Sequence, residues 1–176
     1  MSILVEVVRE FDETLLEQLL ELEKKAFPPN MQFPEEKEYY RQCLENGSNI
    51  NIIIKQSNQV IGYVVAVPQS EVYEELKIYD PEMENNDDTF YVDTIMTMPG
   101  ERRFFGIMLL LNKMSEEAAK KGINKFSMHA RKSNGLSRLI LRKFPLTKRI
   151  RTIDNWHGWG EPFDYIEGIY DKFLKK

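Results

Sequence analysis

The sequence has little cysteine and no long hydrophobic run. One of its 176 residues is cysteine, Cys43, which excludes a disulfide framework and suits a reducing compartment. The longest aliphatic stretch, 107–111, is far shorter than the ~20 residues of a membrane-spanning helix. Only 9 residues are glycine and 8 are proline, which excludes collagen-like and low-complexity chains. We therefore expect a globular cytoplasmic protein without a secretory signal or membrane partner.

Several enzyme signatures are also missing. The two histidines and the single cysteine are scattered without metal-ligand spacing, so we expect no metal site. No Ser-His-Asp elbow is visible. The glycine at position 106 is not followed by the Gly-Lys-Ser/Thr of a nucleotide-binding P-loop. These absences exclude the commonest metal-dependent and triad-based hydrolases.

The charges that are present are spread unevenly. Residues 1–117 contain 10 basic and 23 acidic residues, whereas residues 118–176 contain 14 basic and 5 acidic residues. The segment 118–153 contains no acid, and the segment 71–93 contains nine acids and one lysine. A basic face suits phosphates and an acidic face suits amines, so this asymmetry indicates two unlike ligands. The alternative is that both segments are solvated surface.

Periodicity predicts a single mixed α/β domain over residues 1–176. Amphipathic spacing predicts helices at 13–26, 34–44, 107–122 and 133–144, and a short helix in the first half of 69–88. Runs of aliphatic and β-branched residues predict strands at 3–8, 51–56, 60–67, 89–98, 125–130, 150–156 and 164–170. The second and third strands are close enough to form a hairpin.

The strongest local signal is the turn that follows the strand at 89–98. Pro99 and Gly100 break that strand, and the segment 103–108 then opens a helix. A helix N-terminus offers backbone N–H groups and the positive end of a dipole, and Gly106 allows close backbone approach. The sequence therefore predicts an anion cradle. The alternative is that Gly106 is only a packing glycine.

Two motifs resemble the GNAT superfamily of acyl-CoA-dependent N-acyltransferases. The first family motif is Gln/Arg-x-x-Gly-x-Gly/Ala; Arg103 and Gly106 match it, and Met108 departs from the final small residue. The second is Arg-x-Ser-Asn-x-x-Ala, and residues 131–137 read RKSNGLS. The order of elements is similar over nearly the whole chain. The resemblance implies a GNAT-like mixed α+β fold, with a central, mostly antiparallel sheet of about seven strands flanked by about four helices.

The resemblance also implies acetyl-CoA as the acyl-donor cosubstrate. Main-chain groups of Met96 and Met98 would pair with pantetheine, and the N–H of Met96 would polarise the thioester carbonyl. Asn134 would contact pantetheine, and the basic segment 118–153 would meet the 3′-phosphate. The pyrophosphate would bind the backbone N–H groups of one continuous segment, namely Arg103, Phe104, Phe105, Gly106, Ile107 and Met108.

Three residues are candidates for the general base. In family members that acylate protein N-termini, a Glu precedes the Arg of the second motif by two residues. His129 occupies that place, and imidazole titrates near neutrality. Asp93, the single charge in an apolar strand, is the second candidate, and His157 in the last hairpin loop is the third. The family's Tyr that protonates the leaving thiolate corresponds here to Leu141.

The expected reaction is direct attack of a primary amine on the thioester of acetyl-CoA. The acidic segment 71–88 would draw a polyamine-like acceptor or a basic peptide, unless it is only solvated surface. Three aromatic residues would shape an apolar acceptor pocket or belong to the core, namely Trp156, Trp159 and Tyr165.

Two other functions remain open at this point. Leu141 and Met108 fit a catalytically weak acyl-CoA sensor on the same fold. The eleven basic residues in 118–151 would suit nucleic acid, but the overall net charge of −4 argues against that partner. The resemblance is also compatible with a homodimer.

Overall fold

The structure is a computed structural model that describes residues 3–32, 35–100 and 102–170. The chain divides into two compact units, and each is built from two separate segments. The first unit comprises Met1–Ala66 and Thr94–Glu117, and the second comprises Val67–Asp93 and Ala118–Lys176. The domain boundaries 1–176 expected from the sequence stay a prediction.

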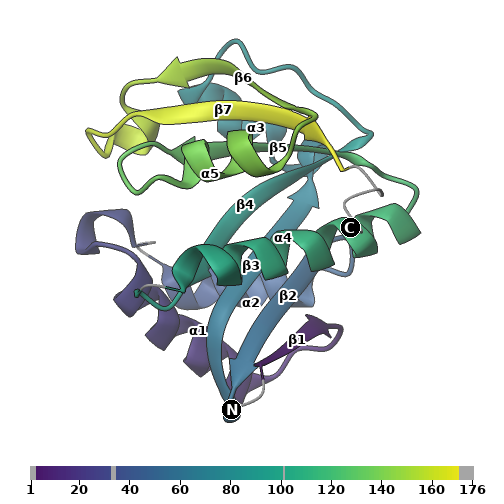
Figure 1. Ribbon diagram of the computed structural model, residues 1–176, viewed down its shortest axis with the longest axis vertical. Coiled ribbons are helices and arrows are strands. Elements are labelled where there is room, and N and C mark those ends of the chain that lie inside the picture. The colour runs from purple at the N-terminus through teal and green to yellow at the C-terminus, as the bar shows by residue number, and fades with distance from the viewer. Residues whose placement is uncertain (1–2, 33–34, 101, 171–176) are drawn as a thin grey trace. The chain divides into compact units, whose positions relative to one another are not determined.

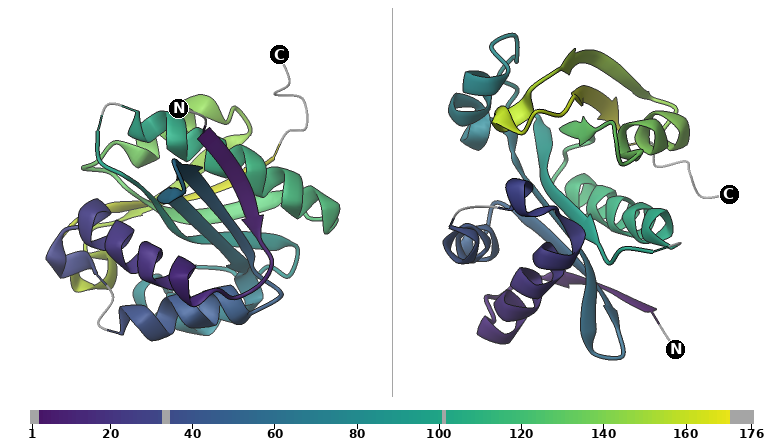
Figure 2. Two further views of the ribbon diagram at one scale, coloured as in Figure 1. Left: turned by 90° about the horizontal axis from the view of Figure 1, so that it is seen from below. Right: turned by 90° about the vertical axis from the view of Figure 1, so that its left-hand side faces the viewer.

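The first unit is a sheet with helices on both faces. Its strands are β1 (Ile3–Val8), β2 (Ile50–Gln56), most of β3 (Gln59–Pro68) and the end of β4 (Thr89–Thr97). Its helical elements are α1 (Glu13–Ala26), a 3₁₀ turn η1 (Pro29–Met31), α2 (Glu36–Glu45) and most of α4 (Arg103–Lys120). In Figures 1 and 2, α4 covers one face of β2 and β3, and α1 and α2 cover the other.

Local sequence explains how α1 begins and what it buries. The carboxylate of Asp12 accepts hydrogen bonds from the backbone N–H of Thr14 at 2.7 Å and of Leu15 at 3.4 Å. An N-cap of this kind satisfies donors that have no partner inside the helix. The helix then buries its apolar stripe, which includes Leu15, Leu16, Leu19 and Leu22. The predicted helix at 13–26 is confirmed.

The predicted hairpin is also confirmed. Strands β2 and β3 are antiparallel, and β1 pairs antiparallel with β2. Ser57 and Asn58 connect β2 to β3 with φ of 50° and 66°, and a two-residue hairpin turn requires this left-handed backbone at its centre. The expected start of the second helix at Pro34 lies outside the described residues.

The second unit contains the remaining strands and helices. It contains α3 (Gln69–Tyr79), the start of β4, β5 (Lys125–Arg131), α5 (Leu136–Lys143), β6 (Thr147–Ile153), a 3₁₀ turn η2 (Trp156–Gly158) and β7 (Phe163–Ile169). Strands β4 and β5 are parallel, whereas β7 pairs antiparallel with both β5 and β6. The view at the right of Figure 2 shows α3 and α5 on opposite sides of these strands.

The strands follow the order β1-β2-β3-β4-β5-β7-β6 in one seven-stranded sheet. The expected fold class, a mixed and mostly antiparallel sheet flanked by helices, is confirmed. Five α-helices are present among the described residues where about four were expected, because α3 is a full helix of 11 residues. Strand β6 begins at Thr147 and ends at Ile153, since Trp156 already belongs to η2.

Candidate functional site

The turn between β4 and α4 is shaped by a proline and a glycine. Pro99 has no N–H to donate to the sheet, and β4 ends two residues before it. Gly100 has φ of 139°, a conformation that side chains rarely adopt. Helix α4 begins at Arg103, so the predicted strand, break and helix are confirmed, and the end of β4 and the start of α4 lie in the first unit.

Gly106 allows the first turn of α4 to approach β4. A Cβ atom at Gly106 would lie 3.0 Å from Cγ2 of Thr97, and a Cβ atom at Gly62 would lie 3.3 Å from the same atom. Thr97 therefore fills the space left by two glycines. This close packing is reason enough for glycine at position 106, as the alternative explanation from the sequence proposed.

The hydrogen bonds in the first turn of α4 leave fewer N–H groups for an anion than the sequence predicts. The N–H of Gly106 donates to the carbonyl of Arg102 at 3.1 Å and so belongs to the helical hydrogen-bond ladder. In an α-helix the N–H groups of Ile107 and Met108 follow in the same ladder. The N–H groups at 104–105 come before this bond, where helices lack internal acceptors. An anion would therefore meet residues 104–105 rather than the whole segment.

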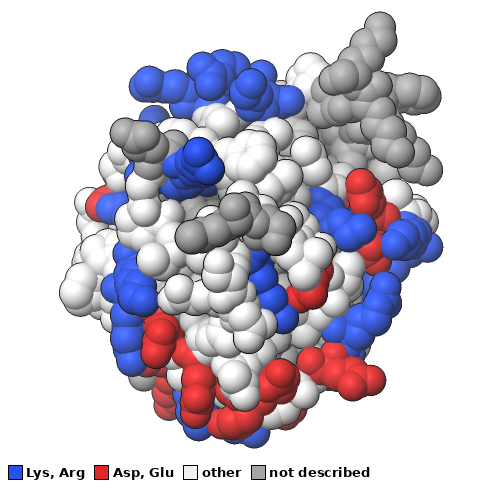
Figure 3. Space-filling view, turned by 60° about the horizontal axis from the view of Figure 1, so that its bottom comes forward, with Lys and Arg blue, Asp and Glu red and all other residues white. Residues whose placement is uncertain are grey.

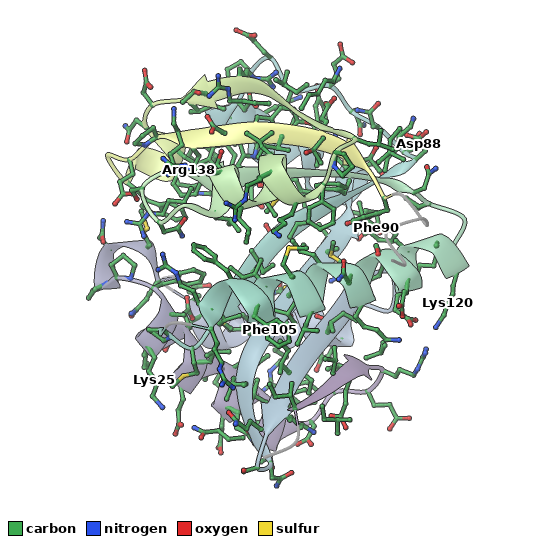
Figure 4. The ribbon with its side chains drawn as sticks, in the orientation of Figure 1. Lys25, Asp88, Phe90, Phe105, Lys120 and Arg138 are labelled. Atoms are coloured by element: carbon green, nitrogen blue, oxygen red, sulfur yellow. The ribbon has the colours of Figure 1, made fainter. Side chains whose placement is uncertain are left out.

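The side chains around this turn are cationic and aromatic. The guanidinium of Arg103 lies 4.6 Å from the centre of the Phe104 ring, and Arg102 is exposed. Phe105 is 56% exposed, and Figure 4 shows it on the N-terminal part of α4. Two arginines next to the positive end of a helix dipole favour a phosphate group.

Side chains alternate regularly along the end of β4. The Oγ1 atom of Thr94 lies 2.7 Å from the hydroxyl of Tyr39, and the hydroxyl of Tyr40 donates to Sδ of Met96 at 3.8 Å. Both tyrosines belong to α2. The hydroxyl of Thr97 instead donates to the carbonyl of Arg103, at 3.4 Å, and faces α4. Met96 itself is buried.

This alternation also fixes the direction of the main-chain groups. The N–H of Met98 donates to the carbonyl of Ile61 on β3 at 2.8 Å, so it is not available to pantetheine as expected. In an extended strand, main-chain groups of residues two apart point to the same edge. From this alternation we infer that the N–H of Met96 points toward β3 as well, and that those of Ile95 and Thr97 point to the opposite edge.

His129, the first candidate base, belongs to a buried hydrogen-bond network in the second unit. Its side chain is 0% exposed, and its Nε2 lies 3.1 Å from Oδ2 of Asp80. Its Nδ1 lies 3.0 Å from the hydroxyl of Tyr91. Asp80 also accepts two hydrogen bonds from the guanidinium of Arg151, at 2.7 and 2.6 Å. The imidazole stacks on Trp156 with ring centres 3.6 Å apart.

The charges in this network follow from burial and pairing. Burial raises the pKa of Asp80, but hydrogen bonds from His129 and Arg151 outweigh it, so the pKa lies below its usual value. Burial lowers the pKa of His129, and Asp80 offsets only part of that shift. We therefore assign a neutral His129 whose Nε2–H donates to the Asp80 carboxylate. Its Nδ1 then accepts the hydroxyl proton of Tyr91.

This geometry argues against His129 as the general base. Both ring nitrogens have partners and the side chain has no exposed surface, so an amine cannot reach it. The partners could not be read from the sequence, because Asp80 lies 49 residues from His129. Histidine is a suitable residue type for a general base, but His129 is part of a buried hydrogen-bond network instead.

The other candidate in this region, His157, lies in an aromatic stack. Its ring stacks on Tyr79 at 3.9 Å between centres and on Trp159 at 5.0 Å. Burial, with a smaller contribution from His129, lowers the pKa of His157 to about 4. Trp156 and Tyr165 are buried, so the expectation of core aromatic residues is confirmed for these two.

The second motif forms the loop between β5 and α5. Arg131 makes two hydrogen bonds to Glu161, one of them at 2.5 Å from Nε to Oε2, and Ser133 donates to the same carboxylate at 2.5 Å. The side chain of Asn134 accepts the N–H of Leu136, the first residue of α5, at 2.9 Å. Glu161 was not singled out in the sequence, because it lies 30 residues from Arg131. The pantetheine contact of Asn134 stays a prediction.

Asp93 and the acidic segment also belong to the second unit. Asp93 lies in β4 and is half-buried. Asp88 is paired with Lys125 at 2.5 Å. Three other acidic residues of the loop after α3 are exposed, namely Glu82, Glu84 and Asp87.

Two expected absences concern only the described parts of the chain. Among those residues, no group of three or more His, Cys, Asp or Glu side chains could hold a metal ion. None of the helices described here is long and apolar enough to cross a membrane.

The fold is similar to solved structures of N-acetyltransferases. An aminoglycoside 6′-acetyltransferase type Ii is 16% identical with a TM-score of 0.68, over 96% of this chain and 97% of that one. A ribosomal-protein-alanine N-acetyltransferase from Brucella melitensis is 17% identical with a TM-score of 0.68, over 94% and 99%. An aminoglycoside 6′-N-acetyltransferase complexed with coenzyme A is 14% identical with a TM-score of 0.67, over 94% and 96%.

No protein-family profile matches the sequence, and no curated protein does. The structural likeness extends over nearly the full length of each chain, whereas the identities are low. Element order, sheet topology and the turn before α4 agree with the resemblance seen in the two motifs. The chain therefore has the fold of the GNAT-family N-acetyltransferases.

Proposed function

We propose that this chain is an acyl-CoA-dependent N-acyltransferase that moves an acetyl group from acetyl-CoA to a primary amine. The observation that carries the proposal is the turn from β4 into α4. There Arg103 is the first residue of a helix whose Gly106 packs on Thr97, within a GNAT fold. Acetyl-CoA would supply the activated acyl group.

The first unit would hold the donor. The N–H groups at 104–105 and the guanidinium of Arg103 would bind the pyrophosphate. The main-chain groups of Ile95 and Thr97 would pair with pantetheine, because the N–H of Met98 is already bonded to β3. For the same reason we assign the polarisation of the thioester carbonyl to the N–H of Ile95 or Thr97 in place of Met96. A fixed donor of this kind contributes about 3 kcal/mol to transition-state stabilisation.

Asp93 takes the role of general base in this proposal. It lies two residues before Ile95 in the same strand, which is about 7 Å along the chain. The amine nitrogen attacks the thioester carbon, a C–N bond forms and the C–S bond breaks. The amine proton passes to the Asp93 carboxylate. The leaving thiolate takes a proton from water, because Leu141 stands where the family has a tyrosine.

The acceptor in this proposal is a cationic amine, polyamine-like or part of a basic peptide. The support is the acidic surface of the second unit, where Glu82, Glu84 and Asp87 are exposed. Asp88 contributes less, because Lys125 already neutralises it. Charge reversal at the three exposed residues should raise the KM for the amine and leave the KM for acetyl-CoA unchanged.

A second candidate function is an acyl-CoA sensor. It is favoured by Leu141, which cannot donate a proton, and by Met108, which adds bulk where the family motif has a small residue. Both functions require acyl-CoA binding, but only the transferase releases the thiol of CoA when an amine is present.

The decisive experiment is calorimetric titration of acetyl-CoA and CoA, followed by measurement of thiol release over a panel of amines. Micromolar binding with amine-dependent thiol release supports the transferase. Binding without release under any amine supports the sensor. If neither acetyl-CoA nor CoA binds, both functions are wrong although the fold is right.

Two substitutions then separate the candidate bases. Asp93→Asn should abolish amine-dependent thiol release and keep acetyl-CoA affinity. His129→Gln should lower thermal stability, and at a temperature where it is folded its kcat should keep the wild-type pH profile. A pH profile that loses its basic limb in His129→Gln would return the role of base to His129.

A further inference from the structure

A cavity of about 490 Å³ lies beside the N-terminal half of α4, wholly within the first unit. Its walls come from β1, the β2–β3 hairpin, the end of β4 and the first turns of α4. Most of its lining is apolar, in particular Ile3, Ile54, Ile61, Met98, Phe105 and Leu109. Small-molecule sites typically have this size and this predominance of apolar walls.

The cavity overlaps the donor site proposed above only in part. It lies on the side of β4 that pairs with β3, where the hydrogen bond from Met98 to Ile61 joins the two strands. No residue from 94–96 lines it. It shares Thr97 and part of the turn after β4 with the proposed donor site, whereas its walls from β1, β2 and β3 lie outside that site.

The polar part of the lining carries one sign of charge. Arg102 and Arg103 line the cavity, and no Asp or Glu is present among its described lining residues. The uncharged polar residues of the described lining are Gln56, Gln59 and Thr97. Figure 3 shows a face of the molecule with a mostly uncharged middle, bordered by Lys and Arg side chains and, along its lower edge, by Asp and Glu side chains. A positive rim on an apolar cavity complements an anion with an apolar body.

The aromatic wall of the cavity is only partly packed. Phe105 is 56% exposed, whereas Leu110 and Leu111 further along the same helix are buried. Large exposed apolar side chains that gather around a concave surface indicate a ligand or partner. Together with the charge of the rim, this favours an amphipathic ligand over a purely polar one.

We propose that this cavity binds an amphipathic anion, a molecule with one carboxylate or phosphate head and an apolar body. The head lies against the guanidinium of Arg102, and the body lies against Ile54, Ile61 and Leu109. The inference does not depend on acetyl transfer, since it concerns a different side of β4.

The test uses dodecanoate as the probe, titrated into the full chain by calorimetry below its micelle concentration. Dodecyltrimethylammonium has the same chain length and the opposite charge, and acetate has the head without the body. Leu109→Trp fills the cavity, and Ile78→Trp is its control because Ile78 is 71% exposed in the second unit. Arg102→Gln removes the charge, and Arg142→Gln is its control.

We expect dodecanoate to bind with a micromolar Kd and one site per chain. Leu109→Trp should weaken it at least tenfold and Arg102→Gln about fivefold, with no change in either control. Dodecyltrimethylammonium and acetate should bind at least tenfold more weakly. If Leu109→Trp lowers the melting temperature strongly, Gln59→Trp takes its place in the test. Gln59 is exposed, and a tryptophan there narrows the mouth of the cavity at the β2–β3 hairpin.

Three results would overturn the proposal. Equal affinity for dodecanoate and dodecyltrimethylammonium would mean that both adsorb unspecifically to the protein. Full competition between dodecanoate and CoA, or loss of CoA binding in Leu109→Trp, would mean that the cavity belongs to the donor site. A concentration-dependent dimer that Leu109→Trp abolishes would mean that a second copy of the chain covers the cavity.

Discussion

The turn before α4 and the network around His129 use polar groups in opposite ways. At the turn, Arg102 and Phe105 are exposed and the first N–H groups of the helix precede its hydrogen-bond ladder. In the network, His129 and Asp80 are buried, and each polar side-chain atom that we describe there has a partner.

This difference separates binding from stability. Polar groups at a surface without internal partners can gain interactions from a ligand, whereas a satisfied buried group has none left to make. Substitutions at the turn should therefore act on ligand affinity, and substitutions in the network should act on the free energy of unfolding. Four predictions test this comparison, from the largest expected effect to the smallest.

The largest effect is expected for Asp80→Asn. It leaves Arg151 without its buried counter-charge and replaces one of the two acceptor oxygens with an N–H2 donor, and breaking such a pair costs about 3–5 kcal/mol. Urea unfolding measures the loss, and Glu82→Gln on the adjacent loop is the control. A change below about 1 kcal/mol would show that the network does not stabilise the second unit.

Gly106→Ala should lower the free energy of unfolding by about 1–3 kcal/mol, because its Cβ would press on Cγ2 of Thr97. Thr97→Ser removes that methyl group, so the double variant should recover at least half of the loss. At an open helical position alanine would instead stabilise by about 1 kcal/mol. Such a gain in chemical denaturation would disprove the packing argument.

Tyr91→Phe should cost about 1–2 kcal/mol, because it leaves Nδ1 of His129 buried without a donor. Burial raises the pKa of Tyr91 well above its ordinary value, so the hydroxyl is a donor throughout the accessible pH range. Tyr73→Phe on α3 is the matched control. Thermal melts of both variants at neutral pH measure the difference, and equal melting temperatures would argue against the assigned tautomer.

The smallest effect is expected for His157→Phe, and it appears only in acid. The pKa of His157 is about 4 in the folded chain and 6.5 in the unfolded chain. Between these values the unfolded state binds more protons, so stability falls as the pH falls from 6.5 to 4. The phenylalanine variant should show a shallower fall in melting temperature over this window. Parallel curves would mean that burial does not perturb His157.

Elements with strong periodicity could be predicted from the sequence alone. The helix at 13–26 and the hairpin after Asn51 follow from apolar spacing and local turn residues, which act over a few positions. Helix α3 was harder to predict from the sequence, because it buries only Gln69 and Leu76 and so has no clear apolar stripe. The end of β6 was misplaced since nothing local marks Trp156 as part of a 3₁₀ turn.

The candidate site was only partly predictable. Arg103 and Gly106 could be located because a helix start after a broken strand is a local pattern. The direction of the N–H groups along 95–98 could not, because it depends on which residue of β4 bonds to β3. A strand read alone has two equivalent edges, and a shift of one residue exchanges them.

Periodicity and neighbouring residues were enough to predict the order of the elements and the place of the helix start after β4, and two motifs carried the resemblance to the GNAT fold. Only the tertiary structure decided that His129 is neutral, buried and bonded to Tyr91 and Asp80. The physical reason is that burial and pairing set the availability of a titratable group. In this chain those partners come from segments that are 38 and 49 residues away.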